Sequence, residues 1–346
     1  MTKPILIDDL DPGSRDSGVP AHFGDPVREQ RLLANEVGIV DRSHRGIVAV
    51  PGADRLSWLH DISTQHLTAL AAGQGTRTLF LSPHGHVEHV AGVTEDGGTT
   101  WLDVEPGDQA PLLDFLNRMR FLLRVEPQDV TAEWALLSLV GPAAAQVLDL
   151  APARVGEVPG PKFAAGTVPP LPTSVYAVTP AFGGWARRDG FGIDLVVPRA
   201  SADAVIEKLD VPRAGLWAYE AMRVEARRAR QGLETDHKTL PAEVDLIADG
   251  VHLEKGCYRG QETVARVHNL GRPPRRLALL HLDGIASDEL PAAGTPVTSD
   301  GRAVGFVGTA VRHHELGQIA LAVVKRNISD EAPLLVGESS AAIDPD

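Results

Sequence analysis

The sequence predicts an α+β protein that ends in a small β-barrel. The first observation is that antiparallel hairpins alternate with single helices, which is typical of α+β folds and unlike the regular repeats of doubly wound sheets. The second is a run of short strands with turns between them at the C-terminal end. The third is the bulk composition: 346 residues, 43% hydrophobic and 23% charged, can bury a large core divided among two or three domains.

A first α+β lobe is predicted for residues 21–130, after a loose polar arm at residues 1–20. Alternating apolar residues across Thr76–Gly92, with a Pro-His-Gly turn in the middle, indicate a hairpin. The pattern of Ala110–Arg120 is helical, and we expect a returning strand over residues 121–130.

A second α+β lobe is predicted for residues 131–272, and the two lobes could exchange segments. It opens on an apolar strand, Ala135–Val140, and contains a loose Pro/Gly-rich stretch at 151–172. Ser201 is placed to cap a helix, and Gly215–Gln231 is the longest helical pattern in the chain.

The β-barrel is predicted for residues 273–346. Its short strands begin after the Arg272-Pro273-Pro274 break and are separated by turn residues. The spacing of these strands favours a closed barrel or a small sandwich.

Charge and cysteine content narrow the classes of function. A net charge of −13 argues against general nucleic-acid binding, because that requires a basic surface to replace counterions on phosphates. The sequence has no apolar run long enough to predict a membrane span, and its N-terminal residues do not resemble a secretory signal. The single cysteine, Cys257, fits a reducing compartment, so we expect a cytoplasmic protein.

The segment Lys255-Gly256-Cys257-Tyr258-Arg259-Gly260-Gln261-Glu262 carries the clearest chemical signal. Its glycines let the backbone turn tightly, and a helix is expected to follow from Gln261. A cysteine just before a helix N-terminus, with Lys255 and Arg259 nearby, favours the thiolate form. Cys257 is therefore the candidate reactive group, and the alternative is an inert buried cysteine.

This octapeptide resembles the signature of the YgfZ family, a branch of the glycine-cleavage T-protein superfamily. A weaker resemblance extends from about Ala34 to Lys325. It includes Val37–Ser43 with Val50–Asp54, the Arg-Val-Glu-Ala motif that begins at Arg223, and Val304–Gly308 in the predicted barrel. The resemblance implies a three-lobed ring, made of two related α+β lobes and the barrel, with a folate pocket in a central channel.

The resemblance also implies a function. Members of the YgfZ family bind folate and support iron–sulfur cluster assembly or repair and tRNA modification. Tetrahydrofolate or a one-carbon derivative is the expected cofactor, and iron–sulfur client or assembly proteins are the expected partners. Tyr258, Gln261 and Glu262 would contact folate, although Gln261 and Glu262 could instead cap the following helix.

Arg223 is the other predicted folate contact. On a continuous helix Arg223, Arg227 and Arg230 would share one face, and arginine pairs well with the carboxylates of a folate tail. For Arg227 and Arg230 the favoured interpretation is a solvated basic stripe paired with Glu220 and Glu234.

Two positions depart from the transferase pattern that the resemblance brings with it. His89 or Val90 stands where aminomethyltransferases have an acidic residue, with Glu88 available only in another strand register. Arg188 stands where they have a pterin-binding glutamate, and arginine cannot accept hydrogen bonds. A conventional aminomethyltransferase is therefore not expected. A folate-dependent one-carbon transferase or demethylase, or a binding module without folate, stays open.

No metal site is predicted. His84, His86 and His89 fall in one hairpin, but the alternation of a strand would not bring all three to one face. A single cysteine also cannot hold an iron–sulfur cluster of the usual kind, which needs about four ligands. A cluster shared with a partner, or a redox or transfer role for Cys257 beside folate, stays open.

Overall fold

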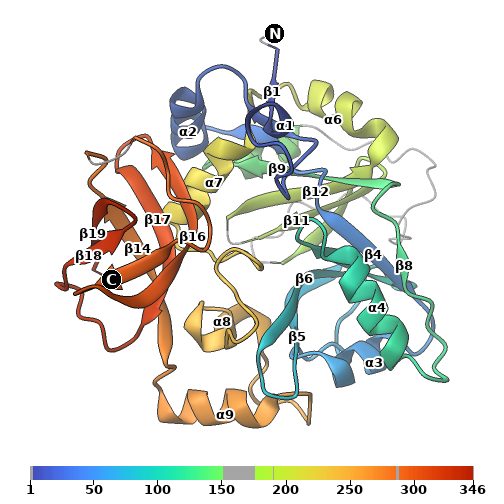
Figure 1. Ribbon diagram of the computed structural model, residues 1–346. Helices are drawn as coiled ribbons and strands as arrows, with labels where there is room; N and C mark the ends of the chain where they lie inside the picture. Colours follow the sequence, from blue (N-terminus) through green and yellow to red (C-terminus); the bar gives the residue numbers. More distant parts are fainter. Residues whose placement is uncertain (1–2, 151–175, 190, 286–287, 346) are drawn as a thin grey trace. The chain divides into compact units, whose positions relative to one another are not determined.

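The computed structural model describes residues 3–150, 176–189, 191–285 and 288–345 (Figure 1). By its internal contacts the chain divides into two compact units. The first unit comprises Met1–Thr78 and His89–Tyr219, and the second comprises Leu79–Glu88 and Glu220–Asp346. The predicted stretch at 151–172 lies outside the described residues, and the predicted domain boundaries stay a prediction.

A six-stranded sheet forms one layer of the first unit. Its strands, in spatial order, are β10 (Val178–Ala181), β11 (Gly184–Arg188), β12 (Gly192–Pro198), β9 (Trp134–Val140), β3 (Gly38–Asp41) and β13 (Arg213–Ala214). Every residue of β9 is buried, because this strand is central and is covered on both faces.

A five-stranded sheet forms the other layer. Its spatial order is β5 (Gln74–Leu81), β6 (Val87–Glu95), β7 (Thr99–Val104), β4 (Gly46–Pro51) and β8 (Gln128–Asp129). The predicted hairpin over Thr76–Gly92 is β5 and β6, and its tip belongs to the second unit.

Helices accompany both sheets of the first unit. They are α2 (Pro26–Asn35), α3 (Arg55–Ile62), α4 (Gln109–Met119), α5 (Ala144–Leu150) and α6 (Ala202–Leu209), with a 3₁₀ turn at Arg199–Ser201. Asp25 caps α2 by accepting a hydrogen bond from the Arg28 amide, and Pro26 fills the first turn. Ser201 occupies the N-cap of α6 as predicted, but its side chain forms no capping hydrogen bond among the described residues.

The two sheets of the first unit pack through a core rich in tryptophan. Trp101 from β7 meets Trp134 and Trp185 from the six-stranded sheet, with ring centroids 5.1 to 5.5 Å apart. All three are buried, and Ile47, Leu136 and Val196 pack around them. Rings of this size bury large apolar areas, so they contribute strongly to the packing of the two sheets.

The predicted C-terminal barrel is confirmed. Six strands close in the order β14 (Arg275–Leu282), β17 (Gly317–Lys325), β16 (Arg302–His313), β15 (Pro296–Ser299), β18 (Leu334–Val336) and β19 (Ser339–Ile343). Small and branched side chains such as Ala278, Val307 and Val324 fill the interior, as expected for a narrow barrel. The α+β class of the chain is confirmed as well.

The second unit also contains the end of α7 (Leu216–Glu225), a 3₁₀ turn at Pro241–Glu243, α8 (Ile247–Gly250) and α9 (Gln261–Leu270). The predicted helix over Gly215–Gln231 is wrong beyond residue 225. Arg227 takes a left-handed conformation with φ of 51°, and the Arg228 amide donates back to the Arg223 carbonyl. This is a Schellman end formed without glycine, which explains why the sequence pattern does not show it.

Two further segments differ from the prediction. The strand expected over residues 121–130 is reduced to β8, because Phe121 has a φ of 44° and the following backbone turns. The arm at residues 1–20 is partly folded: β1 (Ile5–Leu6) pairs with β2 (Pro20–His22), and α1 (Ile7–Leu10) lies between them. Ile7 and Val19 are buried, so apolar anchors hold this segment despite its polar composition.

Candidate functional site

The octapeptide of residues 255–262 lies in the second unit, as a loop that leads into α9 (Figure 1). Gly260 stands at the N-cap of α9 with a left-handed φ of 81°. Gly271 ends the helix in the same conformation, and the Gly271 amide donates to the Val267 carbonyl. The helix expected after the octapeptide is confirmed, and its start fixes the direction from which the loop arrives.

The loop is pressed against the tip of the β5–β6 hairpin. A Cβ added to Gly260 would lie 2.7 Å from the Gly85 Cα, and one added to Gly85 would lie 2.8 Å from the Thr263 Cβ. Only glycine at these two positions lets the backbones approach so closely. Arg259 adds a half-exposed ion pair to Glu88 of the hairpin, at 3.4 Å.

Lys255 and Tyr258 form the inner side of the loop. Both are buried, and the Lys255 Nζ lies 5.2 Å from the centroid of the Tyr258 ring. Burial raises the pKa of Tyr258 to about 12. The Gln261 side chain donates to the Lys255 carbonyl at 3.3 Å, so it ties the two ends of the loop together.

Cys257 lies on the outer side of the same loop and is exposed. A Cβ added to the preceding Gly256 would meet nothing within 4 Å, so the space around this stretch is open. The buried interpretation of Cys257 is therefore wrong, and its reactivity stays a prediction. Glu262 is exposed too, and it pairs with Arg266 one helical turn later at 2.9 Å.

Arg223 is buried among protein partners in the second unit. Its guanidinium donates to Glu220 Oε2 at 2.8 Å and to Thr309 Oγ1 at 2.6 Å, and it contacts Glu234 at 3.3 Å. Burial alone would lower the pKa of Arg223, but Glu220 and Glu234 raise it above its ordinary value. A folate carboxylate would have to displace one of these partners, so the geometry favours a structural role.

The predicted solvated stripe of arginines is not formed. The predicted pairing with Glu220 is confirmed for Arg230, at 3.1 Å, but Arg230 is buried rather than solvated, and Arg227 reaches Asp344 at 3.6 Å instead. Since α7 ends before both residues, the shared helical face on which the prediction depended does not exist.

A second cluster, which the sequence analysis missed, lies between the two sheets of the first unit. Three buried arginines alternate with three buried carboxylates: Arg42, Arg45, Arg187, Asp103, Glu105 and Asp194. Arg187 bridges Asp103 at 2.5 Å and Asp194 at 3.4 Å, so it connects β7 to β12. Arg45 contacts Asp103 at 3.2 Å and also pairs with Glu105.

The ion pairs of this cluster compensate for the burial of its charges. Burial alone would raise the pKa of Asp103, but the guanidiniums of Arg187 and Arg45 hold it well below its usual range. A Cβ at Gly92 would lie 2.4 Å from Asp103 Oδ1, so glycine there leaves room for the pair. Charged residues inside otherwise apolar strands, as in Leu102-Asp103-Val104, are the sequence signal that could have found it.

Aromatic rings and unsatisfied donors surround the cluster. Arg42 stacks 4.3 Å from the centroid of the Tyr219 ring, and Phe191 meets Tyr219 edge-on at 5.1 Å. The Nε1 of Trp185 and the Nε of Arg187 are buried without an acceptor among the described residues. Trp185 and Arg187 are two positions apart on β11, so both side chains point to the same face of the sheet.

The remaining predicted positions lie as follows. His89 is buried and its Nδ1 lies 2.9 Å from Asp108, whereas Arg188 is the last residue of β11. His84 and His86 sit at the hairpin tip, with ring centroids 6.1 Å apart. Within the described part of the chain, no group of three His, Cys, Asp or Glu residues could hold a metal ion. No helix there is long and apolar enough to cross a membrane.

Comparison with known proteins gives two family matches. The model of the GCVT N-terminal domain matches residues 19–248, and that of the CAF17 C-terminal beta-barrel domain matches residues 275–346. The second range coincides with the barrel of the structure, and the first ends upstream of the octapeptide.

Curated relatives cover most of the chain. A chloroplastic protein of Arabidopsis thaliana with a provisional transferase name is 27% identical over 84% of this chain, which spans 65% of that relative's length. An aminomethyltransferase of Symbiobacterium thermophilum is 30% identical over 84% of this chain and 79% of its own length. An aminomethyltransferase of Geobacillus kaustophilus is 29% identical over 90% of this chain and 85% of its own length.

A solved structure has the same fold. The aminomethyltransferase T of the glycine cleavage system from Bartonella henselae superimposes with a TM-score of 0.77, covering 96% of this chain and 91% of that one at 19% identity.

Proposed function

This chain belongs to the GCVT family, and from that premise we propose that it binds tetrahydrofolate or a one-carbon derivative of it. We place it in the YgfZ branch, as a factor that supports iron–sulfur cluster assembly or repair and tRNA modification rather than glycine cleavage. The observation that carries this placement is the pairing, on one chain, of a GCVT N-terminal domain with a CAF17-type barrel.

The unsatisfied donors of the first unit fit a pterin ring. A pterin presents ring-nitrogen and carbonyl acceptors, which are what the buried Trp185 Nε1 and Arg187 Nε lack. The aromatic rings of Phe191 and Tyr219 supply the apolar, stacking surroundings that such a ring requires. These residues would hold the folate head, whose one-carbon chemistry belongs to the cofactor itself.

Cys257 has a separate role in this proposal. It is the only cysteine of the chain, so it supplies one thiolate to a cluster whose other ligands come from a client protein. Its exposure leaves it accessible to such a client, while Lys255, Tyr258 and Gln261 hold the loop in shape. Glu262 is exposed beside it and is available to the same partner.

Complementation tests this function. In a bacterial strain that lacks its own YgfZ-family protein, expression of this chain should restore the activity of iron–sulfur enzymes and the thiolation of tRNA. The variant Cys257→Ser should restore neither, while Ile285→Ser, at another exposed site, should restore both. Full rescue by Cys257→Ser would remove the thiolate from the mechanism.

A second candidate is a folate-dependent one-carbon transferase or demethylase. The observation in its favour is that relatives 26 to 30% identical over most of the chain are named aminomethyltransferases. It predicts steady conversion of tetrahydrofolate to its methylene form with an aminomethyl donor, whose carbon is already at the oxidation level of formaldehyde and whose amine is the leaving group. If the protein binds tetrahydrofolate but shows no turnover, the donors tested are excluded as substrates.

A further inference from the structure

The segment from Arg118 to Arg124, between α4 and β8, exposes large apolar side chains next to one another. Phe121 and Leu122 are each 86% exposed, and Met119 and Leu123 are at least 40% exposed. No other large apolar residues of the described chain are both exposed and adjacent in sequence. A contiguous exposed patch of this kind marks an interaction site more often than isolated exposed residues do. We call this segment the apolar–basic loop.

The loop is firmly held by its backbone. The Trp58 Nε1 donates to the Met119 carbonyl at 3.1 Å, and the Arg124 amide donates to Asp54 at 2.9 Å. Gly52 lets the loop pass close by, because a Cβ there would lie 2.0 Å from the Arg124 carbonyl oxygen. Phe121 is kept at a φ of 44°, a conformation that costs a bulky residue free energy. A fixed backbone that holds two apolar side chains in water is a preorganised binding surface.

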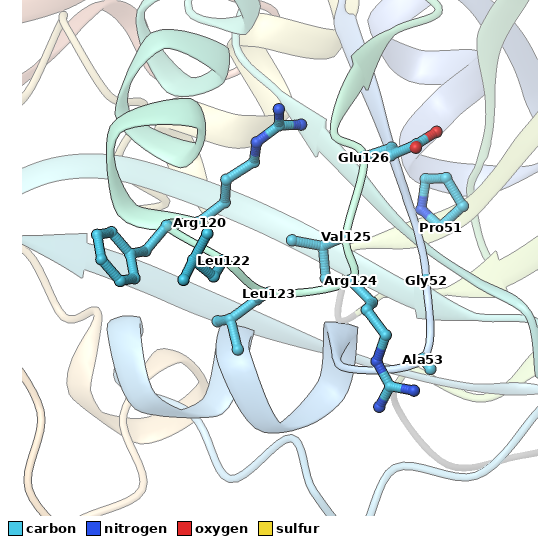
Figure 2. Close-up of a pocket in the computed structure, with 10 residues that line it drawn as sticks. Pro51, Gly52, Ala53, Arg120, Leu122, Leu123, Arg124, Val125 and Glu126 are labelled. Carbon is cyan, nitrogen blue, oxygen red and sulfur yellow. The ribbon is translucent and has the colours of Figure 1, made fainter.

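A groove runs beside the loop. Its volume is about 490 Å³, and it is bounded on one side by Pro51, Gly52 and Ala53 and on the other by residues 120–126. Figure 2 shows Arg120 and Arg124 extending in opposite directions from the segment, with Leu122 and Leu123 between them. The groove lining therefore combines apolar side chains with Arg120, Arg124 and one carboxylate, Glu126.

The charges of the loop indicate what it binds. Arg118 and Arg120 are exposed and have no ion-pair partner among the described residues, whereas Arg124 is paired with Asp54. Both arginines belong to the same segment as the exposed Phe121 and Leu122. Arg120 lines the groove, and Arg118 lies in the last turn of α4 just before it. These two cations make the loop complementary to a ligand with negative charges.

We propose that the apolar–basic loop and its groove dock an extended segment of a partner protein, in which large apolar side chains alternate with aspartate or glutamate. The concave groove favours a peptide, because a lipid surface cannot fill it. The apolar side chains would enter the groove, and the carboxylates would pair with Arg118 and Arg120.

Peptide display tests the proposal with the full-length protein. A random-peptide phage library is selected on the wild type, with counter-selection on a variant carrying Phe121→Ser, Leu122→Ser, Arg118→Glu and Arg120→Glu. We expect enriched sequences that alternate leucine or phenylalanine with acidic residues. A labelled peptide from this set should bind the variant about tenfold or more weakly by fluorescence anisotropy.

Matched controls separate the loop from general surface effects. Ile285→Ser and Arg302→Glu remove an exposed apolar residue and an exposed cation elsewhere, and they should leave peptide affinity unchanged. All variants should keep the circular dichroism spectrum and the tetrahydrofolate affinity of the wild type, so a failure here is distinct from a failure of the proposed folate site.

Three results would overturn the proposal. The first is a selection without acidic–apolar enrichment, or with enrichment unaffected by the loop variant. The second is loop-dependent binding to phosphatidylserine vesicles without peptide binding, which would assign the loop to a membrane surface. The third is a dimer, seen by sedimentation, that the loop variant abolishes, which would assign it to a second copy of the chain.

Discussion

Arg223 shows how one side chain can match a family motif and still serve the fold. Its guanidinium is enclosed by Glu220, Glu234 and Thr309, so replacing it would remove the cation that two buried carboxylates share. Removal of one partner from a buried ion-pair network typically costs about 3–5 kcal/mol.

We therefore expect Arg223→Ala to lower the free energy of unfolding by about 3–5 kcal/mol, measured by urea denaturation. Arg227→Ala, at a partly exposed pair with Asp344, is the control and should cost about 1 kcal/mol or less. Normal stability of Arg223→Ala combined with lost tetrahydrofolate affinity would instead make Arg223 a ligand contact.

Tyr258 makes the stability of the protein depend on pH in the alkaline range. Its pKa is raised from 10.0 to about 12 because the phenolate would be buried in the folded state. The folded chain thus keeps the proton that the unfolded chain releases, so this contribution to stability is intact below pH 10 and is lost as pH rises towards 12.

The variant Tyr258→Phe should consequently lose less stability than the wild type between pH 10 and pH 12, measured by thermal unfolding. Spectroscopic titration should also show one late-ionising tyrosine that is missing in the variant. Identical alkaline profiles of the two proteins would mean that Tyr258 is open to solvent.

At the level of single residues, sequence reasoning predicted the features of the octapeptide loop better than it predicted the contacts of buried side chains. The exposure of Cys257 and the turn at Gly260 follow from a glycine-flanked cysteine among polar neighbours. The buried partners of Arg223 do not, because Thr309 is distant along the chain and is brought close only by tertiary packing.

Among the elements, the loop before α9 depends on its contact with the hairpin tip. The Gly260→Ala variant would strain a left-handed residue and force its Cβ against the Gly85 backbone. We expect the free energy of unfolding to fall by about 1–3 kcal/mol. We also expect trypsin to cleave faster after Lys255, because this residue is buried while the loop is docked.

The neighbouring Gly256→Ala variant is the matched control. Its added methyl meets nothing within 4 Å, so both stability and the cleavage pattern should stay at wild-type values. Equal sensitivity of the two variants would show that the loop is not docked on the hairpin. Mass spectrometry of the fragments identifies the cleaved bond.

The two sheets of the first unit are joined by charge as well as by tryptophan. Asp103→Asn would leave Arg45 and Arg187 buried without their shared anion, and we expect about 3–5 kcal/mol of destabilisation. Asp54→Asn, at the exposed pair with Arg124, should cost less than about 1 kcal/mol. Similar losses in both variants, measured by urea denaturation, would contradict a structural role for the cluster.

The elements themselves were predicted unevenly. The hairpin over Thr76–Gly92, α9 and the barrel have local signals, namely alternating apolar residues, a glycine stop and short strands between turns. The early end of α7 and the reduced strand after Phe121 depend on left-handed residues that are not glycine. Propensity disfavours such conformations, so no sequence rule would have placed them.

For the molecule as a whole, the alternation of hairpins with single helices predicted the α+β class, while the family assignment came from motifs spread along the chain. The charged cluster between the sheets draws on residues from 42 to 194, and only the folded chain gathers them. The loop that the octapeptide forms in the second unit was visible in sequence, whereas the charged cluster of the first unit was not.

Calorimetric titration of tetrahydrofolate into the wild-type protein and into Trp185→Phe tests most directly whether this chain is a folate-binding member of its family. We predict saturable binding to the wild type and affinity about fivefold to tenfold weaker in Trp185→Phe, which keeps the ring packing and removes one buried donor. No binding to a wild-type protein with a folded circular dichroism spectrum would contradict the folate assignment.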